Sequence, residues 1–201
     1  MNRMQREKEQ YALKKLQQGH LDGAEVIYRA LIEEGAVSYT IFGNLAFICG
    51  MQGRKQEMIS LLRKAIAINP NYPEAYNNLG NALKNQGNLY AAINAYRQAL
   101  AMKPHYPEAY FNLGNALKGQ GNLQAAIDAY RQALAINTDY PDAYNNLGNA
   151  LKGQGHLQAA IDCYRQALDI KPHYAEACFN LGNALKDQGN LQAAIDAYRQ
   201  A

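Results

Sequence analysis

Cysteine is scarce in this chain, and the few copies present are far apart. Cys49, Cys163 and Cys178 make an odd number, and none belongs to a CxxC pair. This pattern favours neither a disulfide framework nor a zinc site. The histidines are equally scattered over predicted turns, at His20, His105, His156 and His173. Because metal coordination needs converging ligands, we expect free, mostly buried thiols, no metal site and no cofactor.

The chain also lacks a strong charge of either sign and any long apolar run. Its 20 basic and 17 acidic residues give a net charge of +3 and are spread along the sequence, without the basic stripe that binds nucleic acid. Its first residues, MNRMQREKEQ, are charged rather than apolar. No later run approaches the roughly 18 apolar residues of a membrane-spanning helix. We therefore expect a cytoplasmic protein whose partners include neither nucleic acid nor a membrane.

Catalytic motifs are missing as well. The sequence contains no Ser/His/Asp set, no phosphate-binding loop and no paired carboxylates placed for acid–base chemistry. We expect that the chain is not an enzyme and has no catalytic residue.

What the sequence does contain is an internal repeat with a period of 34 residues. The stretch that begins at Pro73 is repeated almost unchanged from Pro107, and the pattern recurs from Pro141 and Ala175. We expect one domain, residues 1–201, of six units, the last ending after 27 of its 34 places: 5–38, 39–72, 73–106, 107–140, 141–174 and 175–201.

Each unit is predicted to form two helices with a turn between them. Pro73 suits the first position of a helix, Gly87 can end that helix, and Asn88 can cap the next one. The same signals return as Gly121 with Asn122, Gly155 with His156, and Gly189 with Asn190. Apolar residues recur every three or four residues, which gives each helix one buried stripe. Stacked hairpins can cover these stripes, whereas a single hairpin cannot.

The unit resembles the tetratricopeptide repeat. It has an aromatic residue at its fourth place, Leu-Gly at its seventh and eighth, alanine at its twentieth and twenty-seventh, an aromatic at its twenty-fourth and proline near its thirty-second. In the third unit these residues are Tyr76, Leu79, Gly80, Ala92, Tyr96, Ala99 and Pro104. The resemblance implies an all-α, right-handed superhelical solenoid of antiparallel helix hairpins. In the first unit Lys8 and Lys15 occupy core places, as expected of an N-terminal capping repeat.

Asparagines on the first helix of each unit are the candidate binding residues. The sixth place holds Asn44, Asn78, Asn112, Asn146 and Asn180, and the ninth holds Asn81, Asn115, Asn149 and Asn183. Two places three residues apart share one helix face, which the resemblance assigns to the concave surface. Asparagine is a mediocre helix former, but its carboxamide can pair with the N–H and C=O of an extended peptide. The array resembles the asparagine ladder in the repeats of O-linked N-acetylglucosamine transferases.

Two other interpretations of the asparagines remain open. Recent copying of one unit would propagate neutral asparagines, and the ninth-place residues could instead bond a neighbouring hairpin. The second unit keeps Asn44 but has Phe47 at its ninth place. Around the ladder, Phe111 and Phe179 are candidate apolar contacts, and lysines at the twelfth place, such as Lys118, are either groove residues or solvated helix ends.

The sequence therefore supports two classes of function. The first is a protein-interaction scaffold that binds an extended peptide or partner segment through the asparagine ladder. The second is a self-assembling module, because the last helix, with Ile195 and Tyr198, is short and has no following hairpin to cover it, so that two chains could pair there. The chain could also be the recruitment fragment of a larger enzyme such as a glycosyltransferase, although no transferase domain is present.

Overall fold

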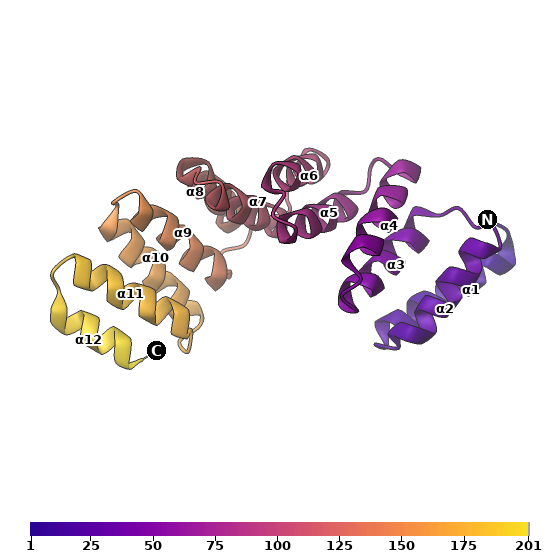
Figure 1. Cartoon of the computed structure of the whole chain (residues 1–201). Coiled ribbons are helices and arrows are strands. Elements are labelled where there is room, and N and C mark those ends of the chain that lie inside the picture. Colours follow the sequence, from indigo (N-terminus) through magenta and orange to yellow (C-terminus); the bar gives the residue numbers. More distant parts are fainter. Residues whose placement is uncertain (201) are drawn as a thin grey trace. The chain divides into compact units, whose positions relative to one another are not determined.

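The computed structural model describes residues 1–200, which form twelve α-helices and no strand (Figure 1). The chain divides into two compact units, Met1–Asn88 and Leu89–Ala201, which we describe separately. The first unit contains α1 (Arg3–Gln17), α2 (Leu21–Glu33), α3 (Tyr39–Met51), α4 (Lys55–Ile68) and α5 (Pro73–Asn85). The second contains α6 (Leu89–Met102), α7 (Pro107–Gly119), α8 (Leu123–Ile136), α9 (Pro141–Gly153), α10 (Leu157–Ile170), α11 (Ala175–Asp187) and α12 (Leu191–Arg199). No helix among the described residues is long and apolar enough to cross a membrane.

The predicted start and stop signals lie at the helix ends. Proline is the first residue of α5, α7 and α9. Gly121, after α7, has a φ of 78°, and this left-handed conformation lets the Asn122 amide donate to the Leu117 carbonyl at 3.0 Å. The Asn122 side chain then caps α8 by accepting from the Ala125 amide at 3.4 Å. These features confirm the predicted turn chemistry for this hairpin.

His156 does not cap α10, contrary to expectation. Its backbone has nearly the same conformation as Asn122, yet its side chain makes no cap hydrogen bond. The Asn122 carboxamide oxygen accepts from the N3 amide of its helix, whereas the His156 imidazole accepts from none. The turn between α9 and α10 therefore has the left-handed conformation of Gly155 but no side-chain cap after it.

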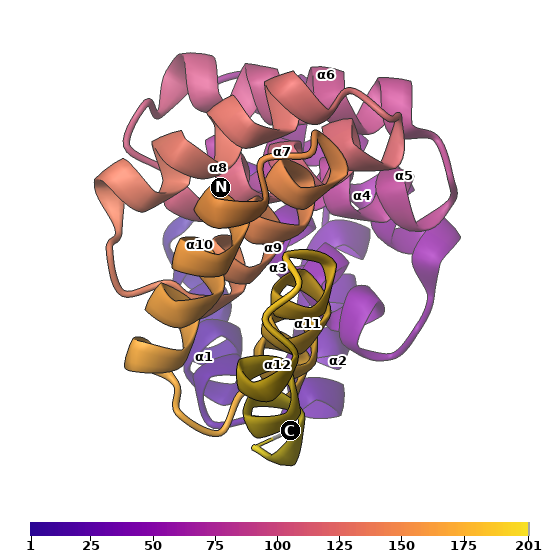
Figure 2. The same ribbon diagram turned by 90° about the vertical axis from the view of Figure 1, so that its left-hand side faces the viewer.

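The second unit is a stack of antiparallel hairpins. Helices α7 and α8, α9 and α10, and α11 and α12 pack as pairs, and the second helix of each pair contacts the first helix of the next (Figures 1 and 2). Successive first helices also contact one another, α7 with α9 and α9 with α11. The first helices therefore form a layer of their own in this unit.

A tyrosine packed on a glycine holds each of these hairpins together. The Tyr130 and Tyr164 side chains are completely buried. A Cβ atom on Gly148 would lie 2.6 Å from Cε1 of Tyr164, and one on Gly114 would lie 2.6 Å from the same atom of Tyr130. Since carbon atoms in contact are about 3.5–4.0 Å apart, only glycine permits this approach of helix and ring.

The first unit adds a network of ion pairs between its hairpins. The Glu25 carboxylate accepts from Arg29 Nε at 2.7 Å and from Arg54 Nη2 at 2.6 Å. Glu57 accepts from Arg29 Nη2 at 2.5 Å and from Arg54 Nη1 at 2.9 Å. Two carboxylates and two guanidinium groups thus link α2 to α4 and to the turn that precedes it.

The first helix, α1, is largely polar. Lys8 forms an ion pair with Glu34 at 2.5 Å, and the Lys15 ammonium lies 5.0 Å from the centre of the Tyr11 ring. Of the residues in α1, only Gln5 and Ala12 are buried. The helix therefore presents a largely hydrated face.

Replacing Gly148 with alanine tests the tyrosine–glycine contact. The added methyl group forces the buried Tyr164 ring or α9 to move, so we expect the free energy of unfolding to fall by about 1–3 kcal/mol. Gly23→Ala is the matched control, because its Cβ would lie 3.4 Å from a flexible lysine side chain and alanine favours helix by about 0.5–1 kcal/mol. Thermal unfolding measures both, and a Gly148→Ala protein as stable as wild type would contradict the prediction.

The ion-pair network predicts a pH dependence of stability. The hydrogen bond from Arg29 holds the pKa of Glu57 below its ordinary value of 4.5. Burial acts to raise the pKa of Glu25, but bonds from Arg54 and Arg29 outweigh it and the pKa is lowered. A lowered pKa in the folded state stabilises above the unfolded pKa, and this contribution disappears as the pH falls through the folded value. Stability should therefore decrease from about pH 5 to about pH 3.

Glu57→Gln should reduce this acid sensitivity. Because Glu57 is about one-third exposed, solvent screening limits the expected loss at neutral pH to about 1 kcal/mol. Glu33→Gln is the control, since Glu33 is exposed and takes part in no ion pair among the described residues. Urea unfolding at neutral and acidic pH measures the difference. An unchanged acid sensitivity in Glu57→Gln would show that other groups cause it.

Candidate functional site

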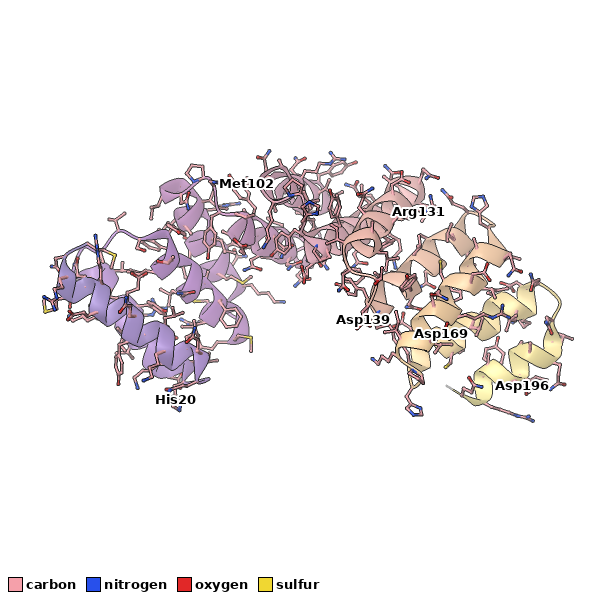
Figure 3. The ribbon with its side chains drawn as sticks, turned by 180° about the vertical axis from the view of Figure 1, so that it is seen from behind. His20, Met102, Arg131, Asp139, Asp169 and Asp196 are labelled. Atoms are coloured by element: carbon pink, nitrogen blue, oxygen red, sulfur yellow. The ribbon has the colours of Figure 1, made fainter. Side chains whose placement is uncertain are left out.

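The predicted ladder residues of the second unit lie on its first helices. Asn112 and Asn115 are on α7, Asn146 and Asn149 on α9, and Asn180 and Asn183 on α11. All six are half-buried. In contrast, exposed charged residues of the second helices, such as Arg131, Asp169 and Asp196, extend into solvent (Figure 3).

Each ninth-place asparagine of α7, α9 and α11 accepts a hydrogen bond from the tyrosine of its own hairpin. The three bonds have the same length of 2.8 Å and join Tyr130 to Asn115, Tyr164 to Asn149, and Tyr198 to Asn183. The tyrosine hydroxyl donates and the carboxamide Oδ1 accepts. The bond satisfies the hydroxyl of a ring that is buried in Tyr130 and Tyr164 and half-buried in Tyr198, and it fixes the rotation of the carboxamide.

Asn146, a sixth-place residue, connects two hairpins. Its Nδ2 donates to Oδ1 of Asn115 on the preceding first helix at 3.0 Å, and its own Oδ1 accepts from the Lys118 ammonium at 3.3 Å. Oδ1 of Asn115 thus accepts two bonds, one from its own hairpin and one from the next. This ninth-place residue does bond a neighbouring hairpin, and both ends of the Asn146 carboxamide are used inside the protein.

Asn180, the sixth-place residue of the next repeat, has a different hydrogen-bond partner. Its Nδ2 donates at 2.9 Å to Oδ1 of Asn145, and Nδ2 of Asn145 donates at 2.9 Å to the Glu176 carboxylate on α11. Asn145 occupies the fifth place of its repeat and is only 1% exposed. It links α9 to α11, a structural role that the sequence analysis missed. The signal available was its exchange with a large apolar residue, phenylalanine, at the fifth place of neighbouring units.

The remaining candidates lie in the first unit. Asn44 is half-buried and donates to the Tyr28 hydroxyl at 3.0 Å. It reaches this hydroxyl directly because Leu13 occupies the ninth place of the first repeat. Asn78 is exposed and Asn81 is half-buried, both on α5. Asn44, Asn78 and Asn81 belong to the first unit, whereas the six asparagines of α7, α9 and α11 belong to the second.

The flanking candidates differ in their environments. Phe111 packs against the rings of Tyr140, 4.9 Å between centroids, and Tyr130, 6.0 Å. Phe179 contacts the Tyr198 ring but remains 55% exposed. Of the two, only Phe179 keeps a largely accessible side chain.

The twelfth-place lysines are not equivalent either. Lys152 forms an ion pair with Asp187 at 2.9 Å. Lys118 instead bonds the Asn146 carboxamide, and burial lowers the pKa of its ammonium group. Lys118 therefore belongs to the hydrogen-bonded layer of first helices rather than being a solvated helix end.

Burial shifts the pKa of several tyrosine and cysteine side chains upward. Burial raises the pKa of Tyr164 and Tyr130 above the ordinary tyrosine value of 10. It also raises the pKa of the Cys49 and Cys163 thiols to about 11. Cys49, Cys163 and Cys178 are free, two of them buried, as the sequence predicts. Within residues 1–200, no group of three or more His, Cys, Asp or Glu residues could hold a metal ion.

Models of the tetratricopeptide repeat match a large part of the chain. The matches cover residues 77–142, residues 129–162, and the two ranges 52–87 and 148–189. Together they run from residue 52 to residue 189, which is more than half of the 201 residues. No curated protein sequence gives a significant match.

Solved structures with the same fold include MamA, which is 29% identical to this chain. The match covers 78% of this chain and 91% of MamA, with a TM-score of 0.74. PilW, a type IV pilus biogenesis factor, is 21% identical, with coverages of 100% and 93% and a TM-score of 0.84. YrrB, described as a TPR protein with an unusual peptide-binding site, is 19% identical, with coverages of 86% and 89% and a TM-score of 0.74.

The predicted all-helical repeat fold is thus confirmed by the helices, by the family matches and by the solved structures. The fold is typical of protein–protein interaction scaffolds. On the repeat matches, the chain belongs to the tetratricopeptide repeat family.

Proposed function

We propose that the second unit is a scaffold that binds an extended polypeptide segment through the ninth-place carboxamides of α7, α9 and α11. One observation carries this proposal. Asn115, Asn149 and Asn183 use Oδ1 to accept from the tyrosines of their own hairpins, while their Nδ2 groups donate to nothing within residues 1–200. None of these Nδ2 groups is a buried atom without a partner, so solvent or a ligand reaches them.

The tyrosine bond makes these donors suitable for main-chain recognition. With Oδ1 held by a hydroxyl, the carboxamide cannot exchange its two ends without losing that bond, so Nδ2 keeps one direction. A fixed donor costs less conformational entropy on binding than a freely rotating one. The carbonyl oxygen of an extended peptide is the complementary acceptor.

The spacing of the helices also suits an extended chain. Packed helices lie about 8–10 Å apart, and an extended peptide advances about 3.3 Å per residue. Donors on successive first helices would then meet carbonyls about three residues apart along one segment. Recognition of this kind gives affinity with weak dependence on the ligand's side chains.

The sixth-place asparagines support the same surface from within. Asn146 joins α9 to α7, and Asn180 joins α11 to α9 through Asn145. Oδ1 of Asn180 accepts no bond within residues 1–200 and adds one acceptor for a peptide N–H. We therefore assign the sixth place of α9 chiefly to holding the layer and the ninth places to the ligand. The likeness to YrrB is one of fold, and the assignment rests on the residues of this chain.

The triple variant Asn115→Asp, Asn149→Asp and Asn183→Asp tests this proposal. Aspartate keeps an oxygen for each tyrosine hydroxyl but removes the NH₂ donors. We expect peptides selected against the wild-type chain from a random displayed library to bind roughly tenfold or more weakly to this variant. Fluorescence anisotropy measures the dissociation constants, and circular dichroism checks that helix content is kept.

A second triple variant controls for the added negative charge. Gln98→Glu, Gln132→Glu and Gln166→Glu place three carboxylates on exposed positions of the second helices. This protein should bind the selected peptides with nearly wild-type affinity. Equal losses in both variants would contradict donor-mediated binding, as would a library selection that yields no binding peptide.

Self-association through α12 is a second candidate, favoured by one observation. Leu191 and Ile195 on α12 are 63% and 43% exposed, whereas Ile161, at the place of Ile195 in the preceding repeat, is 1% exposed because α11 packs over α10. A second copy could cover the same face by two-fold pairing.

Light scattering over a concentration series tests self-association. If α12 pairs two chains, the mass should rise toward twice that of the monomer, and Leu191→Gln with Ile195→Gln should remain monomeric. Val26→Gln, which removes an exposed aliphatic residue from α2, should associate like wild type. A wild-type chain that stays monomeric throughout would exclude this function.

A further inference from the structure

The hairpin of α3 and α4 lacks the tyrosine contact found in α9 and α10. At the places of Tyr164, Gly148 and Asn149, this hairpin has Leu62, Ala46 and Phe47. Three differences thus occur together: the ring is shortened to leucine, glycine is no longer required, and the hydrogen-bonding carboxamide becomes a phenyl group. The hairpin of α3 and α4 therefore has an apolar surface where α9 and α10 have the hydrogen bond between tyrosine and asparagine.

A pocket of about 240 Å³ lies at this exchanged site, between α3, α4 and α5. Buried Ala46 and Leu62 line it, together with Met58, which occupies the twentieth place where other repeats have alanine. Phe47 and Met51 also line the pocket and are 49% and 64% exposed. Two large apolar side chains are therefore accessible at the edge of an apolar hollow.

The polar part of the pocket consists of carboxamides, and no charged residue lines it. Asn78 and Asn85 of α5 line it and are exposed. Neither side chain has a hydrogen-bond partner within residues 1–200. Each therefore offers a free donor and a free acceptor beside the apolar surface.

We infer that this pocket binds one large uncharged side chain, of the leucine class, from an extended segment of a partner protein. Asn78 and Asn85 bond the main chain on either side of that residue. The inference rests on the proposed function only for the polypeptide nature of the partner. Its site lies in the first unit and does not use the Asn115, Asn149 and Asn183 donors.

Size, charge and hydrogen bonding select this occupant. An apolar cavity of about 150 Å³ accepts benzene, so the pocket is large enough for a leucyl or similar side chain. A charged side chain would lose its hydration without gaining an ionic partner. A helical ligand would present main-chain groups already bonded within the helix, whereas an extended segment leaves its N–H and C=O free for the carboxamides.

NMR of the full chain labelled with ¹³C at the methionine methyl groups tests the inference. The probe is the blocked peptide acetyl-Ser-Gly-Leu-Gly-Ser-amide, compared with the same peptide carrying glutamate or lysine in place of leucine. The leucine peptide should shift the Met51 and Met58 signals in a saturable way and leave Met4, an exposed residue of α1, unmoved. The charged peptides should cause less than about a fifth of that shift.

Two variants with the same substitution sharpen the test. Phe47→Asn introduces the ninth-place residue of the third to sixth repeats, and it should weaken binding of the leucine peptide at least about fivefold, or roughly 1 kcal/mol. Phe179→Asn, at a similarly exposed phenylalanine of α11, should leave the affinity unchanged. Equal shifts with leucine and glutamate peptides, absence of any shift at Met51 and Met58, or equal effects of the two variants would each overturn the inference.

These results are separable from a failure of the asparagine donors. The Asn115→Asp, Asn149→Asp and Asn183→Asp variant should still bind the leucine peptide at the Met51 pocket. Loss of that binding in this variant, with helix content intact, would show that the pocket is not an independent site. The wild-type comparison of leucine and charged peptides needs no variant and decides the question even if Phe47→Asn folds poorly.

Discussion

The structure of the second unit depends on one recurring contact, a buried tyrosine that lies on a glycine and donates to an asparagine. Because Gly148 has no Cβ atom, the Tyr164 ring of α10 packs directly against the backbone of α9. The hydroxyl would be costly to bury without a partner, and Asn149 supplies one. Because the acceptor is on the first helix, the packing of the hairpin places a carboxamide on the surface that we propose for ligand binding. Stability and the proposed recognition thus share one side chain.

The sequence predicts the helix ends well, but it does not predict which groups the asparagine side chains bond. Helix ends follow from local chemistry, proline at the first residue and glycine after the last, so the 34-residue period was enough to place them. Which groups a carboxamide bonds depends on neighbours about 15 or 31 residues away, as with Tyr130 and Asn146 at Asn115. The sequence predicted which face carries the asparagines. It did not predict that Asn145 would be buried or that Oδ1 of Asn115 would accept two bonds.

Near-identical repeats also form different bonds, which shows the limit of reasoning from one unit to the next. Asn146 and Asn180 both occupy the sixth place, yet one bonds Asn115 and the other Asn145. The difference follows from the fifth place, where the preceding repeat has Phe111 in one case and Asn145 in the other. An apolar ring offers no acceptor, so the carboxamide bonds the ninth place. A buried asparagine at the fifth place offers a second acceptor, and Asn180 bonds it instead.

One interpretation of the asparagines is that they are neutral copies of an ancestral unit, and the hairpin of α3 and α4 can be compared with it. Simple copying followed by neutral drift would change the tyrosine, the glycine and the asparagine independently. In this hairpin all three are replaced, by Leu62, Ala46 and Phe47. Once the hydroxyl is gone, the carboxamide has no internal bond to make, and the surface it occupied becomes apolar. The first repeat differs again, because it keeps Tyr28 with Leu13 at the ninth place, and the Tyr28 hydroxyl accepts from Asn44 of the next repeat instead. The hairpin of α3 and α4, which has neither the tyrosine nor the asparagine, therefore presents an apolar surface where α9 presents a carboxamide.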